Sequence, residues 1–438
     1  MPDQQIFCNT PWYELHIYWD GSLGICCQEN HKLYPSDQTY NIATTNIRDW
    51  FNSPPVRQFR LDVLGQNRVS ACRRCYVDED SSGHSRRLKS NAKSVIFTRQ
   101  AFDQSWRQSP GYPHFIMSEQ QDGHTQTLPI DLHIDLGNYC NLACKMCDAK
   151  ASSTIAAQQV KWGMQDTRQY LGSDWTKDDR VWNEFLQQLI DIPGLKNIHL
   201  MGGETLLTPR LEQMIDWFIA HGRQDVCFSF VTNGTVYRHD LMTKLSTFGR
   251  VGVEISIETM TDHNRYQRQG TDNSLVIKNI ERFRQWTSFP HISVALRPAP
   301  SILTVGHFHT LLDYALSNQF VVKSNLCIEP SFMRIELLPA SVKSLYRARL
   351  DAWADSIDWP AAAGLDFNAS DPNNCRLILK TQVDMMRTLL DRPCPDDSEV
   401  ELHKLVRHCE RWDRVYGLDA TELYPELREI FIRHDYAV

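Results

Sequence analysis

Three cysteines on one short loop are the first feature of this sequence that points to chemistry. Cys140, Cys144 and Cys147 are separated by three and then by two residues. Thiolates are the ligands that iron–sulfur clusters require, and three of them leave one iron of a four-iron cluster without a protein ligand. Such an open iron binds a substrate or cofactor directly, whereas a zinc site needs a fourth ligand, such as His133 or a distant cysteine. The spacing therefore predicts a [4Fe–4S] cluster with one open iron.

A second group of cysteines lies in the first quarter of the chain. It consists of Cys8, the doublet Cys26-Cys27, and the pair Cys72 and Cys75. Four thiolates saturate either a [4Fe–4S] cluster or a zinc ion, so structural zinc stays open as an alternative. A fully ligated cluster would transfer electrons instead of binding a substrate.

Alternating strands and helices between residues 129 and 330 must position the three-cysteine loop. Strands are expected at 130–136, 197–201, 226–231, 251–257, 292–296 and 320–328, and helices between them at 181–192, 210–221 and 274–286. Six strand–helix units fit an open, partial barrel, in which chemistry lies at the carboxyl ends of the strands. The polar motifs of this segment all fall at those ends.

The flanking segments have a different character. Short strand-like runs and turns are expected in residues 1–95, including a hairpin whose turn is Asp20-Gly21, and a helix at 46–51 that Pro54-Pro55 stops. The predicted fold class is α/β: a partial (β/α)6 TIM-like barrel at 129–330, a small N-terminal α+β cluster-binding domain at 1–95, a connector at 96–128, and a helical C-terminal region at 331–438.

Composition narrows the class of protein. The chain has 438 residues, a net charge of −7 and 13 cysteines. This modest acidic charge argues against nucleic acid or an anionic membrane as a partner. There is no run of 18 apolar residues, and the first residues, Met1 to Gln5, lack the features of a secretory signal. We therefore expect a cytoplasmic protein in which clustered thiols bind metal instead of forming disulfides.

The three-cysteine loop, with its flanking residues from Gly137 onward, resembles the radical SAM superfamily. In that family the open iron binds S-adenosylmethionine, and one electron from the cluster breaks a C–S bond to give a 5′-deoxyadenosyl radical. The aromatic residue usual before the third cysteine is Met146 here.

Motifs at the later strand ends resemble the same family and imply its cofactor contacts. Gly202-Gly203-Glu204 resembles the Gly-Gly-Glu motif that binds the methionine amino group, although Thr205 stands where proline is common. Arg268 lies in a loop that resembles the family's Arg-x-Gly motif and would pair with the cofactor carboxylate. The segment Leu296-Arg297-Pro298 occupies the end of the fifth strand, where the family makes an adenine contact. The strand from Glu254 to Glu258 offers Ser256 as a ribose contact; the alternative is a solvated polar face. The implied cofactor-binding residues are Gly202, Gly203, Glu204, Asn233, Ser256, Glu258 and Arg268.

The N-terminal cysteines resemble the auxiliary-cluster modules called SPASM and twitch domains. This resemblance implies a second [4Fe–4S] cluster on Cys8, Cys26, Cys72 and Cys75, and the spacing favours Cys26 over Cys27. A full SPASM module has a further cysteine where Ser81 stands, so the set resembles a twitch domain with one cluster. Such modules commonly follow the barrel, whereas this set precedes it.

The resemblance implies a radical SAM enzyme that abstracts a hydrogen atom from an organic substrate. A peptide side chain and a small molecule, such as a sugar or a nucleotide, are equally compatible substrates, and a reductant such as flavodoxin or ferredoxin is the expected partner. No catalytic residue is assigned. His263, Tyr266 and Glu329 lie at or just past strand ends and could touch substrate, and Cys327 could face the active site, but a surface or core position is the default for each. The alternative is a non-catalytic iron–sulfur or zinc protein with a structural or electron-relay role.

Overall fold

A computed structural model describes residues 6–29, 40–82, 85–93, 112–172, 174–359 and 372–437. The first sixteen residues of the expected connector, 96–111, lie outside this described part. The chain divides into two compact units. The first contains residues 1–138, 172–229 and 243–250, and the second contains residues 139–171, 230–242 and 251–438.

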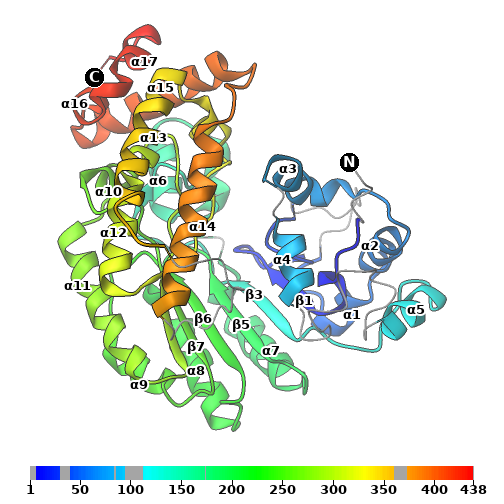
Figure 1. The fold of residues 1–438 in the computed structure, drawn as a ribbon. Helices are drawn as coiled ribbons and strands as arrows, with labels where there is room; N and C mark the ends of the chain where they lie inside the picture. The colour runs from blue at the N-terminus through cyan, green and yellow to red at the C-terminus, as the bar shows by residue number, and fades with distance from the viewer. Residues whose placement is uncertain are drawn as a thin grey trace. The chain divides into compact units, whose positions relative to one another are not determined.

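The first unit contains the N-terminal strands and the first strands of the expected barrel (Figure 1). Its strands are β1 (Glu14–Ile17), β2 (Leu23–Gly24), β3 (Asp131–Asp135), β5 (Asn197–Met201) and the start of β6 (Cys227–Thr232), in the sheet order β6-β5-β3-β1-β2. The predicted hairpin is present, because β1 and β2 pair antiparallel. The sequence did not predict that β1 also pairs in parallel with β3, so the sheet runs through the expected boundary between residues 95 and 129.

Helices fill more of the N-terminal segment than the sequence suggested. They are α1 (Ile47–Phe51), α2 (Pro54–Leu64), α3 (Arg73–Ser82) and α4 (Arg86–Lys93), followed by α5 (Tyr112–Gln120). Asn46 caps α1 by accepting a hydrogen bond from the Asp49 amide. Pro54 and Pro55 do not only stop α1. They also begin α2, since proline needs no amide partner in a first helical turn.

Alternation along the strands gives the sheet of the first unit one apolar and one polar face. Leu132, Ile134, Ile198 and Leu200 are completely buried. The helices α7 (Asp179–Ile190) and α8 (Pro209–Ala220) lie beside these strands, and Phe218 of α8 packs edge-on against Phe228 of β6. The opposite face carries polar residues in register, because His16, His133 and His199 are Cα partners across β1, β3 and β5.

The second unit contains the remaining strands and the C-terminal helices. The end of β6 continues into the order β10-β9-β7-β6, with β7 (Val251–Ile255), β9 (Ile292–Leu296) and β10 (Val321–Val322) parallel to one another. A separate antiparallel ribbon joins β4 (Ala143–Cys144) to β8 (Arg268–Gln269). The α-helices of the second unit are α6 (Ser153–Lys161), the start of α9 (His239–Leu245), α10 (Asp262–Gln267), α11 (Asn273–Arg284), α12 (Phe308–Asn318), α13 (Ala340–Ala354), α14 (Pro372–Leu390), α15 (Ser398–Tyr416), α16 (Ala420–Leu423) and α17 (Arg428–Arg433).

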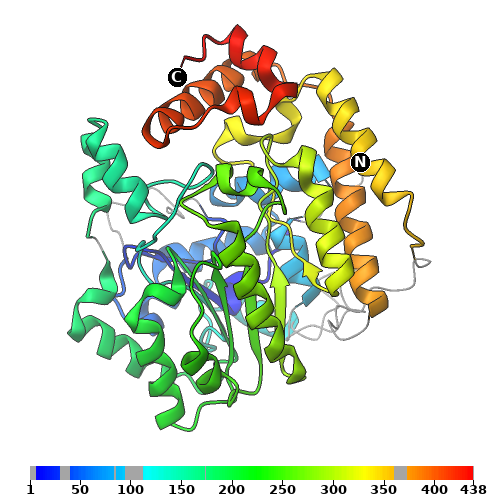
Figure 2. The same cartoon turned by 90° about the vertical axis from the view of Figure 1, so that its left-hand side faces the viewer.

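The predicted fold class is confirmed. The six strands expected between residues 129 and 330 all form, and the helices expected at 181–192, 210–221 and 274–286 begin and end within two residues of those bounds. The C-terminal region is helical, with α13 packed against α14, and α15, α16 and α17 grouped together (Figure 2). In the described part of the chain, no helix is both long and apolar enough to cross a membrane.

Candidate functional site

The three-cysteine loop is held from two sides within the second unit. Cys144 lies on β4, where it pairs with Arg268 of β8. On the other side, the start of α6 binds the loop backbone: Ser152 donates to the Leu142 carbonyl at 2.7 Å and Thr154 donates to the Cys140 carbonyl at 2.6 Å. Ser152 also caps α6 by accepting from the Ile155 amide. The loop is therefore fixed by backbone pairing and by a helix cap.

A buried arginine lies beside the thiols of this loop. The Arg268 Nη1 atom is 3.9 Å from Cys144 Sγ, and its Nε donates to Glu258 Oε1 at 2.8 Å. The second oxygen of Glu258 accepts from the Ala299 amide at 2.5 Å. Burial lowers the pKa of Arg268, but the charges of Glu258 and of the cysteines outweigh burial and raise the pKa above its usual value. Arg268 is therefore a permanent positive charge, and Glu258 holds it in place.

The cysteine thiols themselves differ in acidity. The hydrogen bond that Cys144 and Cys147 share lowers the pKa of Cys144 and raises that of Cys147, and the charge of Arg268 lowers both. A thiolate is the form that binds iron.

Asn233 and Ser256 lie where the sequence placed them, at the ends of β6 and β7. The Asn233 Nδ2 atom donates to Asn141 Oδ1 at 2.9 Å and lies 3.9 Å from Cys140 Sγ. Ser256 is buried, and its amide donates to the Thr232 carbonyl at 2.8 Å. Both predicted residues therefore belong to the unit that carries the cysteine loop.

Glu254, another polar residue of this region, forms ion pairs with two basic side chains. Glu254 on β7 binds Arg297, which follows β9, and also accepts from Lys323 Nζ at 2.8 Å. Of the three residues expected on one face of this strand, Glu254 and Glu258 are thus paired with arginines, and Ser256 lies between them.

A buried ion pair behind the loop was not predicted. Lys145 directly follows Cys144 in the loop, and its side chain has an exposed fraction of 0%. Its Nζ atom lies 3.5 Å from Asp413 Oδ1 and 3.8 Å from the centre of the Tyr266 ring. Asp413 Oδ2 accepts from the hydroxyls of Tyr266 and Tyr436 at 2.8 and 2.7 Å. Helix α15 therefore fixes the loop through its Asp413 side chain.

The Gly-Gly-Glu segment belongs to the first unit and has a conformation that requires glycine. Gly202 has φ of +111°, and a Cβ atom there would lie 2.5 Å from the Gly137 carbonyl oxygen. The Gly203 amide donates to that same oxygen at 3.1 Å. Glu204 is buried, and one of its oxygens accepts from the Leu206 amide at 3.1 Å. Gly202 thus allows this segment to pack closely against the residues that follow β3.

The first unit encloses a cavity of about 20 Å³ that all four predicted N-terminal thiols line, together with Arg86 and Arg87. The four thiols are those of Cys8, Cys26, Cys72 and Cys75, whereas Cys27 does not line it. Four thiols around one cavity suit either a [4Fe–4S] cluster or a tetrahedral zinc ion.

The thiols of this cavity are buried enough to resist ionisation without a metal. Burial raises the pKa of all four, and that of Cys75 to about 11. Bound iron and a neighbouring arginine are the positive charges that favour the thiolate form at neutral pH.

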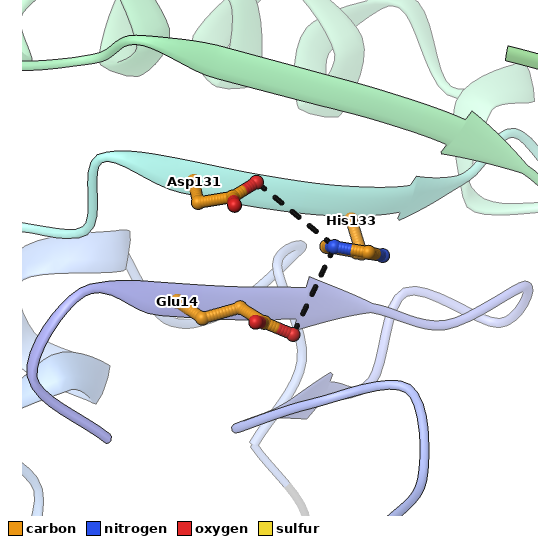
Figure 3. Close-up of side chains that lie close together, drawn as sticks. All are labelled: Glu14, Asp131 and His133. Atoms are coloured by element: carbon orange, nitrogen blue, oxygen red, sulfur yellow. Dashed lines mark ion pairs between the residues drawn. The ribbon is translucent and has the colours of Figure 1, made fainter. Parts of the chain in front are cut away.

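Close to this cavity, Glu14, Asp131 and His133 have ligand atoms within 4.8 Å of one another (Figure 3). Arg86 already supplies a positive charge there: its Nη2 donates to both Glu14 oxygens at 2.7 Å and lies 3.1 Å from His133 Nε2. Since an arginine N–H only donates, the imidazole Nε2 is the acceptor in this contact. We assign no metal ion to this group.

The four side chains considered for substrate contact lie in the following surroundings. The ring of His263 stacks on that of His307 at 3.7 Å, and its Nε2 lies 3.2 Å from the Leu423 carbonyl. Tyr266 is bound to Asp413, as described above. Cys327 is buried and Glu329 is exposed. His263 and Tyr266 thus pack against the C-terminal helices.

Comparison with known proteins agrees with these two thiol sets. The family model for the radical SAM superfamily matches residues 134–289, and the model for the SPASM iron–sulfur cluster-binding domain matches residues 8–76. Residues 134–289 thus form a radical SAM domain and residues 8–76 a SPASM domain. The cofactors that these two domains imply are a [4Fe–4S] cluster with S-adenosylmethionine and an auxiliary iron–sulfur cluster. The matched SPASM segment contains all four thiols of the N-terminal cavity.

Solved structures with bound S-adenosylmethionine are similar to parts of this chain at low identity. Native anSMEcpe with bound AdoMet is 16% identical over 52% of this chain and 62% of its own, with a TM-score of 0.38. SuiB of Streptococcus suis bound to S-adenosylmethionine is 14% identical over 72% of this chain and 67% of its own, with a TM-score of 0.38. The chain thus spans about three-fifths to two-thirds of these relatives. No curated protein matches at a significant level.

Proposed function

We propose that this chain is a radical SAM enzyme that cleaves S-adenosylmethionine reductively and abstracts a hydrogen atom from an organic substrate. The observation that carries the proposal is the three-thiol loop of Cys140, Cys144 and Cys147, held by β4, β8 and α6 beside the buried Arg268. A [4Fe–4S] cluster on these thiols would supply the electron and an open iron for the cofactor.

The chain's own residues would bind and orient the cofactor. Arg268 stands beside the thiols as a fixed positive charge, and Asn233 lies near Cys140 Sγ. Glu204 is the proposed acceptor for the methionine ammonium. Gly202 and Gly203 are the proposed backbone contacts beside it. Ser256 is the proposed ribose contact. Glu258 would act through Arg268, which uses one of its oxygens while the Ala299 amide uses the other.

We further propose that Cys8, Cys26, Cys72 and Cys75 hold the auxiliary cluster. Four protein thiols leave no iron open, so this cluster would exchange electrons with a substrate-derived radical. A small reductant such as flavodoxin or ferredoxin would supply the electron for cofactor cleavage.

The substrate is proposed as an organic molecule, either a peptide side chain or a small metabolite. SuiB is known in complex with its precursor peptide SuiA, and anSMEcpe in complex with a Cp18Cys peptide. A gene for a short precursor peptide next to this one would favour the peptide, and genes for sugar or nucleotide enzymes would favour the metabolite.

Anaerobic reconstitution with iron and sulfide tests the proposal. We expect about eight irons per chain in the wild type and about four in a Cys140/Cys144/Cys147→Ala variant, since each cluster holds four. On reduction with S-adenosylmethionine, 5′-deoxyadenosine should form only with intact Cys140, Cys144 and Cys147, and the exposed Cys394→Ala is the matched control. A wild type that binds only zinc and forms no 5′-deoxyadenosine would support the non-catalytic alternative instead.

A further inference from the structure

Arg86, the first residue of α4, connects the N-terminal thiol cavity with the sheet of the first unit. Its side chain lines the cavity together with Cys8, Cys26, Cys72 and Cys75. Its Nη2 atom donates to both oxygens of Glu14 on β1 and lies 3.1 Å from His133 Nε2 on β3. One end of the guanidinium is therefore held by the sheet while the side chain borders the thiols.

The Nε–H group of Arg86 is a buried hydrogen-bond donor without an acceptor in the described part of the chain. A buried donor without an acceptor is unfavourable, so an acceptor in the cavity would stabilise it. The sulfur atoms of a cluster accept hydrogen bonds of this kind.

Arg87, the next residue, lines the same cavity, but each nitrogen of its guanidinium donates a hydrogen bond to the protein. Its Nε donates to Glu79 Oε1 at 2.9 Å, its Nη2 also binds Glu79, and its Nη1 donates to the Phe7 carbonyl at 2.8 Å. Arg87 thus holds the backbone and α3 together, and Arg86 is the cavity arginine whose Nε remains available.

The charge of Arg86 is fixed. Burial lowers its pKa, but Glu14 and the cysteines Cys27 and Cys26 outweigh burial and raise the pKa well above its usual value. A fixed positive charge beside a cluster stabilises the reduced, more negative state relative to the oxidised one, and a hydrogen bond to sulfur acts in the same direction.

We propose that Arg86 is a positioning residue that raises the reduction potential of the auxiliary cluster, through its charge and its Nε–H, while Glu14 and His133 hold it in place. This inference rests on the proposed auxiliary cluster and assigns a role that the cysteines alone do not supply. In the one-electron couple concerned, the substrate-derived radical is oxidised and the auxiliary cluster is reduced. A higher potential makes the cluster a better acceptor.

The test measures the potential of the auxiliary cluster alone. The Cys140/Cys144/Cys147→Ala chain serves as parent, so that the N-terminal cluster is the one observed. Reductive titration followed by electron paramagnetic resonance gives its midpoint potential, and iron analysis gives its occupancy. Neither readout depends on cleavage of S-adenosylmethionine.

Four substitutions are introduced into this parent. Arg86→Gln should shift the midpoint to a more negative potential, and Arg86→Lys should shift it less, because it keeps the charge but loses Nε–H. Glu14→Gln should shift it in the opposite direction, because it removes a negative charge next to Arg86. Arg73→Gln is the matched control: it makes the same charge change at an exposed residue next to Cys72 and should leave the midpoint near that of the parent.

Equal midpoints in the parent, Arg86→Gln and Arg86→Lys would overturn the inference. If Arg86→Gln loses its iron, the other two variants provide the test. A more negative midpoint in Arg86→Lys and a more positive one in Glu14→Gln would support the inference, and unchanged midpoints in both would overturn it. A parent without any cluster signal would instead refute the proposed auxiliary cluster itself, so the two failures are distinguishable.

Discussion

The ion pair between Lys145 and Asp413 gives the sharpest prediction for stability. Both side chains have an exposed fraction of 0%, and they join the cysteine loop to α15. Asp413→Asn keeps the shape of the side chain and an oxygen that can accept from Tyr266 and Tyr436, but removes the charge opposite Lys145. The variant therefore tests the charge more than the packing.

The expected loss follows from leaving a buried ammonium without its carboxylate. Breaking a buried pair in this way typically costs 3–5 kcal/mol. We take about 3 kcal/mol, because the 3.5 Å separation is longer than a good charged hydrogen bond. For a folding unit of 150–250 residues, this corresponds to a melting temperature lower by roughly 6–12 °C.

The assay combines thermal unfolding of the reconstituted protein with iron analysis. The reconstituted Asp413→Asn protein should also lose iron from the three-cysteine loop, since Lys145 stands within it. Lys145→Met with Asp413→Asn removes both charges and should recover more than half of the lost stability. Glu422→Gln, at an exposed acid of the same region, is the control. A melting temperature within about 2 °C of the wild type for Asp413→Asn would refute the reasoning.

Three further predictions concern the two thiol sets and the C-terminal packing. Glu258→Gln removes the carboxylate that holds Arg268, and should weaken iron binding by roughly 10–100-fold in a chelator competition, as is typical of residues that orient a metal site. Cys26→Ser should lose about four irons per chain on reconstitution, whereas Cys27→Ser should keep them, because only Cys26 lines the cavity. Burial lowers the pKa of His307 to about 4, so the folded state favours the neutral imidazole. The stability that this provides is fully present above about pH 6.5, the usual histidine pKa, and is lost as the pH falls toward 4. His307→Gln should flatten the fall in melting temperature over that interval.

Each of these has an outcome that contradicts it. Unchanged iron affinity in Glu258→Gln would mean that Arg268 is held well enough by its surroundings. If Cys27→Ser loses iron and Cys26→Ser retains it, the ligand is Cys27 and not Cys26. Parallel pH profiles of the wild type and His307→Gln would show that His307 does not contribute to the acid transition. His291→Gln, at a half-buried histidine just before β9, is the matched control.

The strands and helices of the barrel region were predictable because their signals are local. Strands with alternating apolar residues, such as 197–201, end at a glycine, and periodic apolar residues such as those of α7 fall on one helix face. The N-terminal segment was predicted less well. Its helices are short and polar, with a proline pair that begins α2 instead of only ending α1.

Contacts between distant residues were out of reach. Nothing in the sequence joins β1 to β3, which pair across more than a hundred residues. Likewise, Lys145 and Asp413 form an ion pair although they are far apart in the sequence. A lysine flanked by thiols, and an aspartate on the buried side of α15 next to Trp412, were the signals present, but no local pattern pairs them.

The two thiol sets use the same physical device. In each, an arginine beside the sulfurs is held by a buried glutamate: Arg268 by Glu258 next to Cys144, and Arg86 by Glu14 next to the N-terminal cavity. The glutamates are 0% and 1% exposed, so each is itself costly to bury unless the arginine pairs with it. The guanidinium suits this position better than lysine, because its planar fork binds a carboxylate with one edge and leaves further N–H donors for sulfur. Each pair therefore delivers a positive charge of fixed direction to a group of thiolates that burial alone would protonate. It follows that replacing either arginine by lysine should change cluster properties even though the net charge is unchanged.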